Sequence, residues 1–394
     1  MIVADVYKGE RLAAHFSQTE SGEVVFAYAK GYAGPPVATS LPLGAGEVVC
    51  PPGQIPAFFA GLLPEGYRLA RLARQRKISL SNELALLLEV GRDTPGDVQI
   101  LAPGERPGPG APLIDGAFSA CKFADLLDRP DGKSLPGVQE KVSALMISLP
   151  ARARAGSAGR ACGVEGIVKL TPRSYPHLVA NEYAHLQAAQ RLGLAVAKSQ
   201  LVTDSVGEQG LFIERFDRAC DDGVIRRIAF EDAAQILELV PAAKYDVTAE
   251  QVIAALCALT AAPLVATQKS FTQFLFAWAT GNGDLHAKNI ALLGSEFERE
   301  LAPIYDIPCT LVYGDDEMAL SIGGKKKGLK AKHWRQLAGD VGLPGRALAG
   351  IAGVVLAAAA AVDWEVLPFE GSVRNGCLRE LRARRYELED LANS

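Results

Sequence analysis

Cysteine and histidine are sparse in this chain, and neither is grouped in the way that metal sites and disulfide frameworks require. The seven cysteines are widely scattered and include no CxxC pair, and the five histidines are equally dispersed. A zinc site or a disulfide-rich scaffold needs paired, closely spaced residues, so neither is expected. We therefore predict reduced thiols and a cytoplasmic protein.

A dominant charge of one sign and a membrane-length apolar run are also missing. The formal net charge is −4, from 41 basic and 45 acidic residues, so nucleic-acid binding by bulk charge is not expected. The uncharged stretch 347–362 falls short of the roughly 20 residues that span a bilayer, and we interpret it as a buried helix. Residues 1–6 include an acidic residue and no basic segment before an apolar one, so no signal peptide and no membrane contact are predicted.

The first third of the chain changes from a strand-like to a helical pattern. With 49% hydrophobic and 22% charged residues, the composition is that of a globular protein long enough for two or three domains. Up to about residue 50, short runs of alternating polarity lie between Gly and Pro turn signals, which predicts strands and hairpins. The pattern becomes helical between 55 and 90, and the Pro/Gly-rich segment 103–110 predicts a linker.

The rest of the chain is mixed up to residue 218 and nearly all helical after residue 231. Strands are predicted at 142–149, 166–170 and 211–213, a loop at 151–160 and a helix at 179–192. Strands followed by helices predict an α+β, protein-kinase-like bilobal fold, with a strand-rich N-terminal part and an all-helical C-terminal lobe. The predicted units are 1–110, 111–218 and 219–394.

The segment Gly281–Asn289, with the sequence GNGDLHAKN, has the spacing of a phosphotransfer loop. Transfer of phosphate from ATP needs a carboxylate that accepts the proton of the attacking hydroxyl, and oxygen ligands for magnesium. Protein kinases supply them as an Asp and, five positions later, an Asn, which is the spacing of Asp284 and Asn289. The pattern is common by chance, so solvated loop residues are the alternative interpretation.

A second carboxylate follows at Asp306, after a predicted hairpin at 291–302. Magnesium prefers oxygen ligands and keeps several waters, so one Asn oxygen and one Asp carboxylate are a sufficient contribution from the protein. Upstream, Lys169 lies among apolar residues on a predicted strand, and its ammonium needs a partner if it is buried. In a kinase the partners are the ATP phosphates and a helix glutamate, here Glu182. The alternative is a strand-edge lysine that points to water.

A phosphate-covering loop is expected before this strand, and 133–141 has the right position but lacks a GxGxxG pattern, so an ordinary turn is the alternative. Taken together, the chain resembles HipA-family serine/threonine kinases over nearly its whole length. The motifs that carry the resemblance, in chain order, are Leu62–Gly66, Gly91–Asp93, Ser134–Lys141, Val168–Leu170, Asn181–Tyr183, Glu214–Arg218, Glu231–Asp232, Gly281–Asn289 and Tyr305–Asp306.

The resemblance implies a role for each chemical group. Asp284 matches the catalytic base, Asn289 and Asp306 match the ligands of Mg²⁺, and Lys169 matches the lysine that binds the phosphates of ATP. Further nucleotide-binding positions implied by the resemblance are Glu214 and Phe216 at the adenine hinge, Asp217 near the ribose, Gly137 and Val138 in the phosphate loop, His286 and Tyr305.

The resemblance also implies self-inhibition. Ser134 matches the family's autophosphorylated serine, and a phosphate there would repel the loop from the ATP phosphates. The chain departs from the family at three positions. Gly283 replaces a common Thr and is expected to loosen the catalytic loop, Phe230 replaces a Gln in some members, and Pro136 stiffens the phosphate loop.

The resemblance implies the toxin of a toxin–antitoxin pair. Family members are repressed by a small helix-turn-helix, HipB-like antitoxin, some phosphorylate an aminoacyl-tRNA synthetase, and operator DNA is bound only indirectly through the antitoxin. Two alternatives stay open: a non-catalytic corepressor module, which the intact site residues argue against, and a small-molecule kinase. The basic run 325–327 with Lys330 either touches DNA in such a complex or is a solvated loop.

Overall fold

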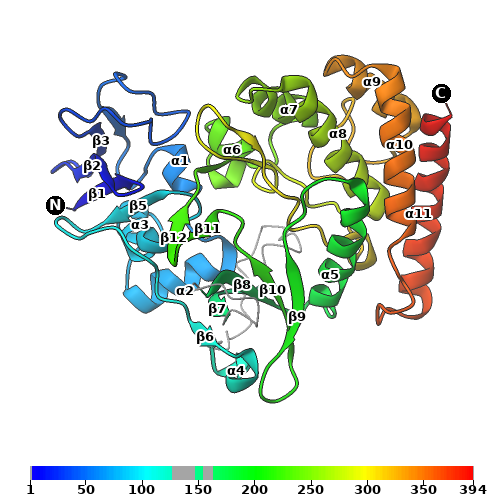
Figure 1. The fold of residues 1–394 in the computed structure, drawn as a ribbon, viewed down its shortest axis with the longest axis horizontal. Coiled ribbons are helices and arrows are strands. Elements are labelled where there is room, and N and C mark those ends of the chain that lie inside the picture. Colours follow the sequence, from blue (N-terminus) through cyan, green and yellow to red (C-terminus); the bar gives the residue numbers. More distant parts are fainter. Residues whose placement is uncertain (1, 127–146, 154–162, 394) are drawn as a thin grey trace.

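The computed structural model describes residues 2–126, 147–153 and 163–393. Strands dominate the N-terminal half and helices the C-terminal part (Figure 1), so the predicted α+β fold class is confirmed. None of the described helices combines the length and the apolar character needed to cross a bilayer.

The N-terminal unit is an antiparallel five-stranded sheet covered by helices, with strand order β4-β3-β2-β1-β5. Its core is aromatic: the ring of Phe59 lies 4.7 Å from Phe16 and 5.5 Å from Phe26, and all three are buried. The predicted change from strands to helices after residue 50 is confirmed. The elements are β1 (Val3–Lys8), β2 (Arg11–Gln18), β3 (Val24–Tyr28), β4 (Val48–Cys50), α1 (Ala57–Ala60), α2 (Gly66–Arg76), α3 (Glu83–Val90) and β5 (Val98–Leu101).

A second five-stranded sheet has the order β6-β7-β8-β10-β9, with β6 and β7 parallel and the other pairs antiparallel. The predicted end of a strand at 149 is wrong. β7 continues through Ala153 because it pairs with β8 as far as Ala153 opposite Val164, and it replaces the first part of the predicted loop. The elements are β6 (Ile114–Gly116), α4 (Phe123–Leu126), β7 (Ile147–Ala153), β8 (Val164–Leu170), α5 (Leu178–Ala189), β9 (Ser199–Thr203) and β10 (Gln209–Glu214).

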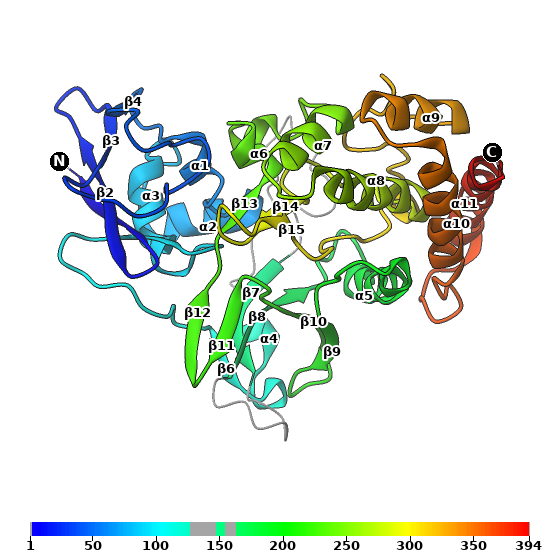
Figure 2. The ribbon, with the colours of Figure 1, turned by 45° about the horizontal axis from the view of Figure 1, so that its top comes forward.

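The remaining described residues are mainly helical and also carry short strands. Figure 2 shows β13, β14 and β15 near the middle of the molecule, beside α8, and the predicted hairpin at 291–302 is the pair β14–β15. The buried helix expected at 347–362 is α10. The elements are β11 (Arg218–Asp221), β12 (Val224–Arg227), β13 (Phe230–Asp232), α6 (Ala233–Ile236), α7 (Ala249–Ala258), α8 (Pro263–Thr280), β14 (Ala291–Leu293), β15 (Glu300–Leu301), α9 (Ala331–Asp340), α10 (Gly345–Ala360) and α11 (Gly371–Ala392).

Among the described residues, the largest buried apolar clusters lie in the N-terminal unit, under the second sheet and among the helices. Side chains of α5 and β10 join the helical cluster, which links the second sheet to the helices. We keep the division at 110 and 218 as a proposal. Among the cysteines, the prediction of reduced thiols is wrong at Cys220, which is disulfide-bonded. The free ones in the described part are Cys50, Cys121, Cys257, Cys309 and Cys377.

Candidate active site

The loop that carries the DxxxxN spacing follows directly after α8 and is buried. Gly281 adopts a left-handed conformation (φ 76°) at the helix C-terminus, and Asn282 turns back to donate its N–H to the Ala277 carbonyl at 2.8 Å. The side chain of Asp284 has 0% of its surface exposed, and Asn289 is also buried. The alternative of solvated loop residues is therefore excluded by the structure.

Hydrogen bonds within the loop fix the backbone around Asp284. The Asp284 N–H donates to Asn282 Oδ1 at 2.7 Å, and Asn289 Nδ2 donates to the Asp284 carbonyl at 2.9 Å. The two residues predicted to act together are thus joined directly. Because the amide nitrogen of Asn289 is used in this bond, its oxygen is the end left for a cation.

Gly283 is tightly packed, against the expectation that it loosens the loop. Its N–H donates to Thr310 Oγ1 at 2.7 Å. A Cβ atom at this position would lie 2.3 Å from the Glu317 carbonyl oxygen, far inside van der Waals contact. The glycine lets Thr310 and Glu317 pack closely against the loop, and this packing gives no sign of the expected loosening.

Tyr245 contacts the predicted catalytic base and was not identified from the sequence. Its hydroxyl donates to Asp284 Oδ1 at 3.2 Å, and its ring meets His286 edge-on at 5.1 Å between centroids. Burial and the adjacent Asp284 carboxylate raise the pKa of Tyr245 well above its ordinary value, so the phenol stays protonated and donates. His286, a predicted nucleotide residue, is buried, and its Nδ1 accepts the N–H of Lys288 at 3.2 Å.

Lys169 is buried between two carboxylates. Its Nζ lies 2.7 Å from Glu182 Oε1 and 2.9 Å from Asp306 Oδ1, which confirms the predicted pairing with Glu182 and excludes a lysine that points to water. Burial opposes the charged form, but the carboxylates of Asp306 and Glu182 outweigh it and raise the pKa of Lys169 above its ordinary value. The ammonium is therefore held charged at a fixed place.

The Asp306 segment is tied to the catalytic loop. The hydroxyl of Tyr305 donates to the carbonyl of Lys288 at 2.8 Å, so the neighbours of Asp306 and of Asn289 are bonded to each other. Asp306 itself has a left-handed backbone (φ 55°), which is uncommon for a residue with a side chain and is often found at functional sites.

The residues predicted to hold magnesium, Asn289 and Asp306, carry oxygen donors of the kind that this ion prefers. Across the described residues, no group of three or more His, Cys, Asp and Glu could hold a metal ion. The predicted set does not need one, because it consists of one amide oxygen, from Asn289, and one carboxylate, from Asp306. Such a set fits a hard cation that keeps several waters, and it does not fit zinc.

Three aromatic rings lie together, and one of them belongs to Tyr305, which directly precedes Asp306 in the chain. The ring of Phe216 is 5.4 Å from that of Tyr305 and 6.1 Å from that of Phe230. Two predicted nucleotide residues, Phe216 and Tyr305, are thus adjacent. Glu214 lies at the end of β10, where its N–H donates to the Lys198 carbonyl at 2.9 Å.

Comparison with known proteins identifies the family of this chain. The family model described as HipA-like C-terminal domain matches residues 133–362, and the model described as HipA N-terminal domain matches residues 4–101. The chain belongs to the HipA-like family.

Relatives of the HipA-like chain include named kinases. The serine/threonine-protein kinase toxin HipA of Shewanella oneidensis is 29% identical over 320 residues, 73% of this chain and 70% of the relative. The protein Y4mE of Sinorhizobium fredii is 30% identical over 378 residues, 87% of each chain. A solved Shewanella oneidensis complex of HipA, HipB and operator DNA contains a chain with the same fold, with a TM-score of 0.79 and 23% identity over 99% of both chains.

Asp217 belongs to a separate group of buried ion pairs in the HipA-like chain. Its carboxylate contacts Arg215 Nη2 at 2.8 Å and Arg218 Nη1 at 2.7 Å, and it accepts the N–H of Gly96 at 2.8 Å. Burial opposes its ionisation, but these arginines hold the pKa of Asp217 well below its usual range. Arg215 also pairs with Asp93 at 2.7 Å, so this group joins the HipA N-terminal domain to β10 and does not contact Lys169.

Two predicted features remain, the phosphate loop and the basic run at 325–330. Ser134, Gly137 and Val138 lie outside the described residues, and their roles stay predictions. In the basic run, Lys327 pairs with Asp316 at 2.8 Å and Lys330 pairs with Glu387 at 3.0 Å.

Proposed function

We propose that this chain is an ATP- and Mg²⁺-dependent serine/threonine protein kinase. The observation that carries the proposal is the charged Lys169 held beside Asp306, on a segment bonded through Tyr305 to the loop of Asp284 and Asn289. This arrangement supplies a phosphate-binding cation, a base and two oxygen ligands on adjoining segments, which are the parts that phosphoryl transfer needs.

In the proposed mechanism, Asp284 accepts the proton of the attacking serine or threonine hydroxyl. Tyr245 keeps one carboxylate oxygen in place through its hydrogen bond. Lys169 contacts the phosphates as a point charge, and Asn289 and Asp306 are the residues that would hold magnesium. Held by these two residues, the ion would neutralise part of the negative charge on the phosphates of ATP.

The nucleotide contacts are proposed from the family resemblance together with the packing. Phe216 and Tyr305 supply neighbouring aromatic surfaces for the adenine end of ATP. Glu214 is assigned to the hinge and His286 to the nucleotide, and the phosphate loop contributes Gly137 and Val138. For Asp217, its ion pairs with arginines favour an indirect role, in which it fixes the hinge segment beside the ribose.

Regulation and partners are proposed on the same basis. Phosphorylation of Ser134 in the phosphate loop would switch the kinase off. The likeness in fold to HipA in complex with HipB and operator DNA supports a small helix-turn-helix antitoxin as partner, with DNA bound through that antitoxin. The proposed role is a cytoplasmic, growth-inhibiting toxin whose substrate is a protein, an aminoacyl-tRNA synthetase being the candidate that the resemblance implies.

A comparison in cells tests this function. Cells that express the wild-type chain should stop growing and gain phosphoserine or phosphothreonine on a small set of proteins, whereas cells that express Asp284→Ala should do neither. Quantitative phosphoproteomics with matched expression levels is the measurement. Growth arrest with equal phosphoproteomes in the two strains would contradict a protein kinase and favour a non-catalytic role.

A further inference from the structure

A carboxylate from the N-terminal domain lies against the catalytic loop. Glu65, at the start of α2, places Oε1 2.7 Å from Lys288 Nζ and Oε2 2.5 Å from Lys244 Nζ. Lys288 Nζ also donates to the carbonyl of Gly61 at 2.9 Å. Two lysines of the C-terminal part are thus held by one short segment of the N-terminal domain.

Both lysines are adjacent to residues that position the predicted base. Lys288 lies in the loop between Asp284 and Asn289, and its carbonyl accepts the hydroxyl of Tyr305. Lys244 directly precedes Tyr245, whose hydroxyl donates to Asp284. Glu65 therefore connects the catalytic loop itself to the segment whose Tyr245 bonds the carboxylate of Asp284.

The side chains of Glu65, Lys244 and Lys288 are largely shielded from water, so loss of one charge would leave the others poorly compensated. The side chains of Lys244 and Lys288 are 9% and 13% exposed, and that of Glu65 is 29% exposed. Burial would raise the pKa of Glu65, but Lys288 and Lys244 outweigh it and hold that pKa below its usual value. Without Glu65, two buried ammonium groups would be left beside each other and would reorganise.

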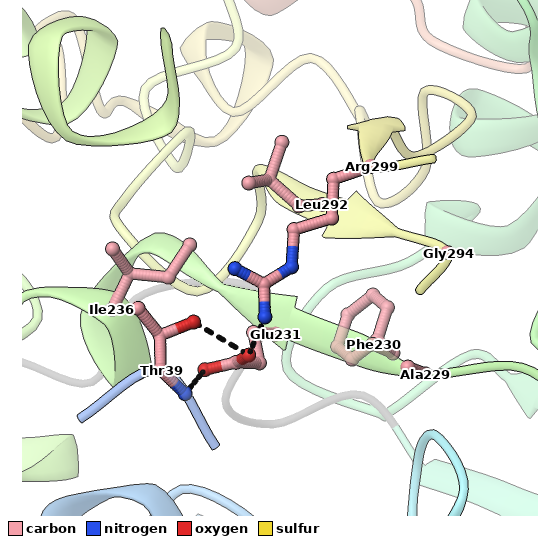
Figure 3. A pocket seen from close by; sticks show the side chains of 8 residues that line it. All are labelled: Thr39, Ala229, Phe230, Glu231, Ile236, Leu292, Gly294 and Arg299. Carbon is pink, nitrogen blue, oxygen red and sulfur yellow. Dashed lines mark hydrogen bonds and ion pairs between the residues drawn. The ribbon is translucent and has the colours of Figure 1, made fainter. Parts of the chain in front are cut away.

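We propose that Glu65 is a positioning residue, so that the N-terminal domain completes the active site by fixing the loop of Asp284. This inference rests on the proposed kinase function for its kinetic test, which measures phosphate transfer. The same junction offers a contrast: Thr39 bonds Glu231 through its N–H at 2.9 Å and its hydroxyl at 2.8 Å, and Arg299 pairs with Glu231 at 3.1 Å (Figure 3). Those contacts join the domains, and Thr39 donates to neither Asp284 nor its loop.

The first test is kinetic. Glu65→Gln keeps the size of the side chain and removes its charge, and it should lower the self-phosphorylation rate at saturating ATP by about 10²-fold through misplacement of the base. The ATP concentration for half-maximal rate should change far less than the rate, because Lys169 and Phe216 lie outside the loop that loses its support. Glu65→Asp should recover part of the rate. The control, Thr39→Val, loses one hydrogen bond of the same junction and should keep the full rate.

The second test does not depend on catalysis. Hydrogen–deuterium exchange of the backbone amides in 281–289 should speed up in Glu65→Gln and stay slow in Thr39→Val. Equal exchange in the two variants would overturn the inference, even if the wild type proved inactive as a kinase. If the wild type showed no kinase activity but exchange was still faster in Glu65→Gln, the positioning role would be supported and the proposed kinase function would be refuted.

Discussion

At the scale of single residues, the site depends on how three ionisable groups share one small volume, the buried Lys169 and Glu182 and the partly exposed Asp306. Lys169 touches Glu182 with both carboxylate oxygens and touches Asp306 with the same ammonium. Removing one member of such a group leaves an uncompensated charge, which costs far more than an exposed pair does. Binding and stability are therefore coupled at Lys169, and a useful experiment has to separate them.

Replacement of Lys169 by methionine should affect both properties. The single variant Lys169→Met should lower the free energy of unfolding by about 3–5 kcal/mol, because Glu182 is left buried without its cation and has to take up a proton. The double variant Lys169→Met/Glu182→Gln should recover most of that stability. It should still bind ATP more weakly than the wild type does, while its affinity for adenosine stays close to that of the wild type. Urea denaturation and calorimetric titration with ATP and with adenosine measure the two effects. An equal loss of adenosine binding in the double variant would show that Lys169 is only structural.

Residue-scale prediction from the sequence succeeded where the signal was local. The apolar surroundings of Lys169 are a property of one short segment, and the structure confirms the burial and the contact with Glu182 that they predicted. The spacing of Asp284 and Asn289 is equally local, and their roles stay predictions. Tyr245 gave no such signal, because its bond to Asp284 joins segments 39 residues apart. Glu65 did stand out as a charge within the motif Leu62–Gly66, but its lysine partners could not be identified without the fold.

At the scale of elements, α5 connects the lysine strand to the helical core. Besides Glu182 it carries Asn181, which donates to the Cys309 carbonyl at 2.9 Å and accepts the Cys309 N–H at 2.9 Å. One turn later lies the buried His185. Its Nδ1–H donates to the Asn181 carbonyl at 2.8 Å, and its ring meets that of Trp364 edge-on. The helix therefore holds the segment that follows Asp306 through buried hydrogen bonds to Cys309.

The pH dependence of stability should report on His185. Burial lowers the pKa of His185 to about 4 from 6.5, so the unfolded chain binds a proton at a pH where the folded chain does not. This contribution to stability is complete above about pH 6.5 and is lost as the pH falls toward 4, by about 1.4 kcal/mol per unit. In urea denaturation series, the stability advantage of wild type over His185→Gln should shrink through that range. A constant difference between the two proteins would contradict a buried neutral imidazole.

Element boundaries were predicted well only where the chain itself contains the stop signal. The helical segment predicted at 179–192 ends at Gly193 in a left-handed conformation, as helices often do at glycine. β7, by contrast, runs on into the predicted loop because β8 offers a partner, and strand pairing of that kind is invisible in one segment alone. The end of β7 is therefore set by how far β8 continues as its hydrogen-bonding partner.

At the scale of the whole molecule, three parts meet around the candidate site. The second sheet brings Lys169, the helical part brings Asp284 and Asp306, and the N-terminal domain brings Glu65 to the catalytic loop and Asp93 to the arginines around Asp217. Figure 1 shows the N-terminal domain beside the helical part and the second sheet below them. The family motifs predicted that each part exists, but the polar contacts between the parts required the structure.

The most direct measurement of the central claim is transfer of labelled γ-phosphate from ATP by the purified chain in the presence of magnesium. The account predicts label on serine or threonine in the wild type, and a rate lower by about 10²–10⁴-fold in Asp284→Ala with ATP binding retained. Asp306→Ala should lose transfer and also weaken magnesium-dependent ATP binding. Transfer at the wild-type rate by Asp284→Ala, or equal loss of ATP binding in both variants, would contradict the assigned roles.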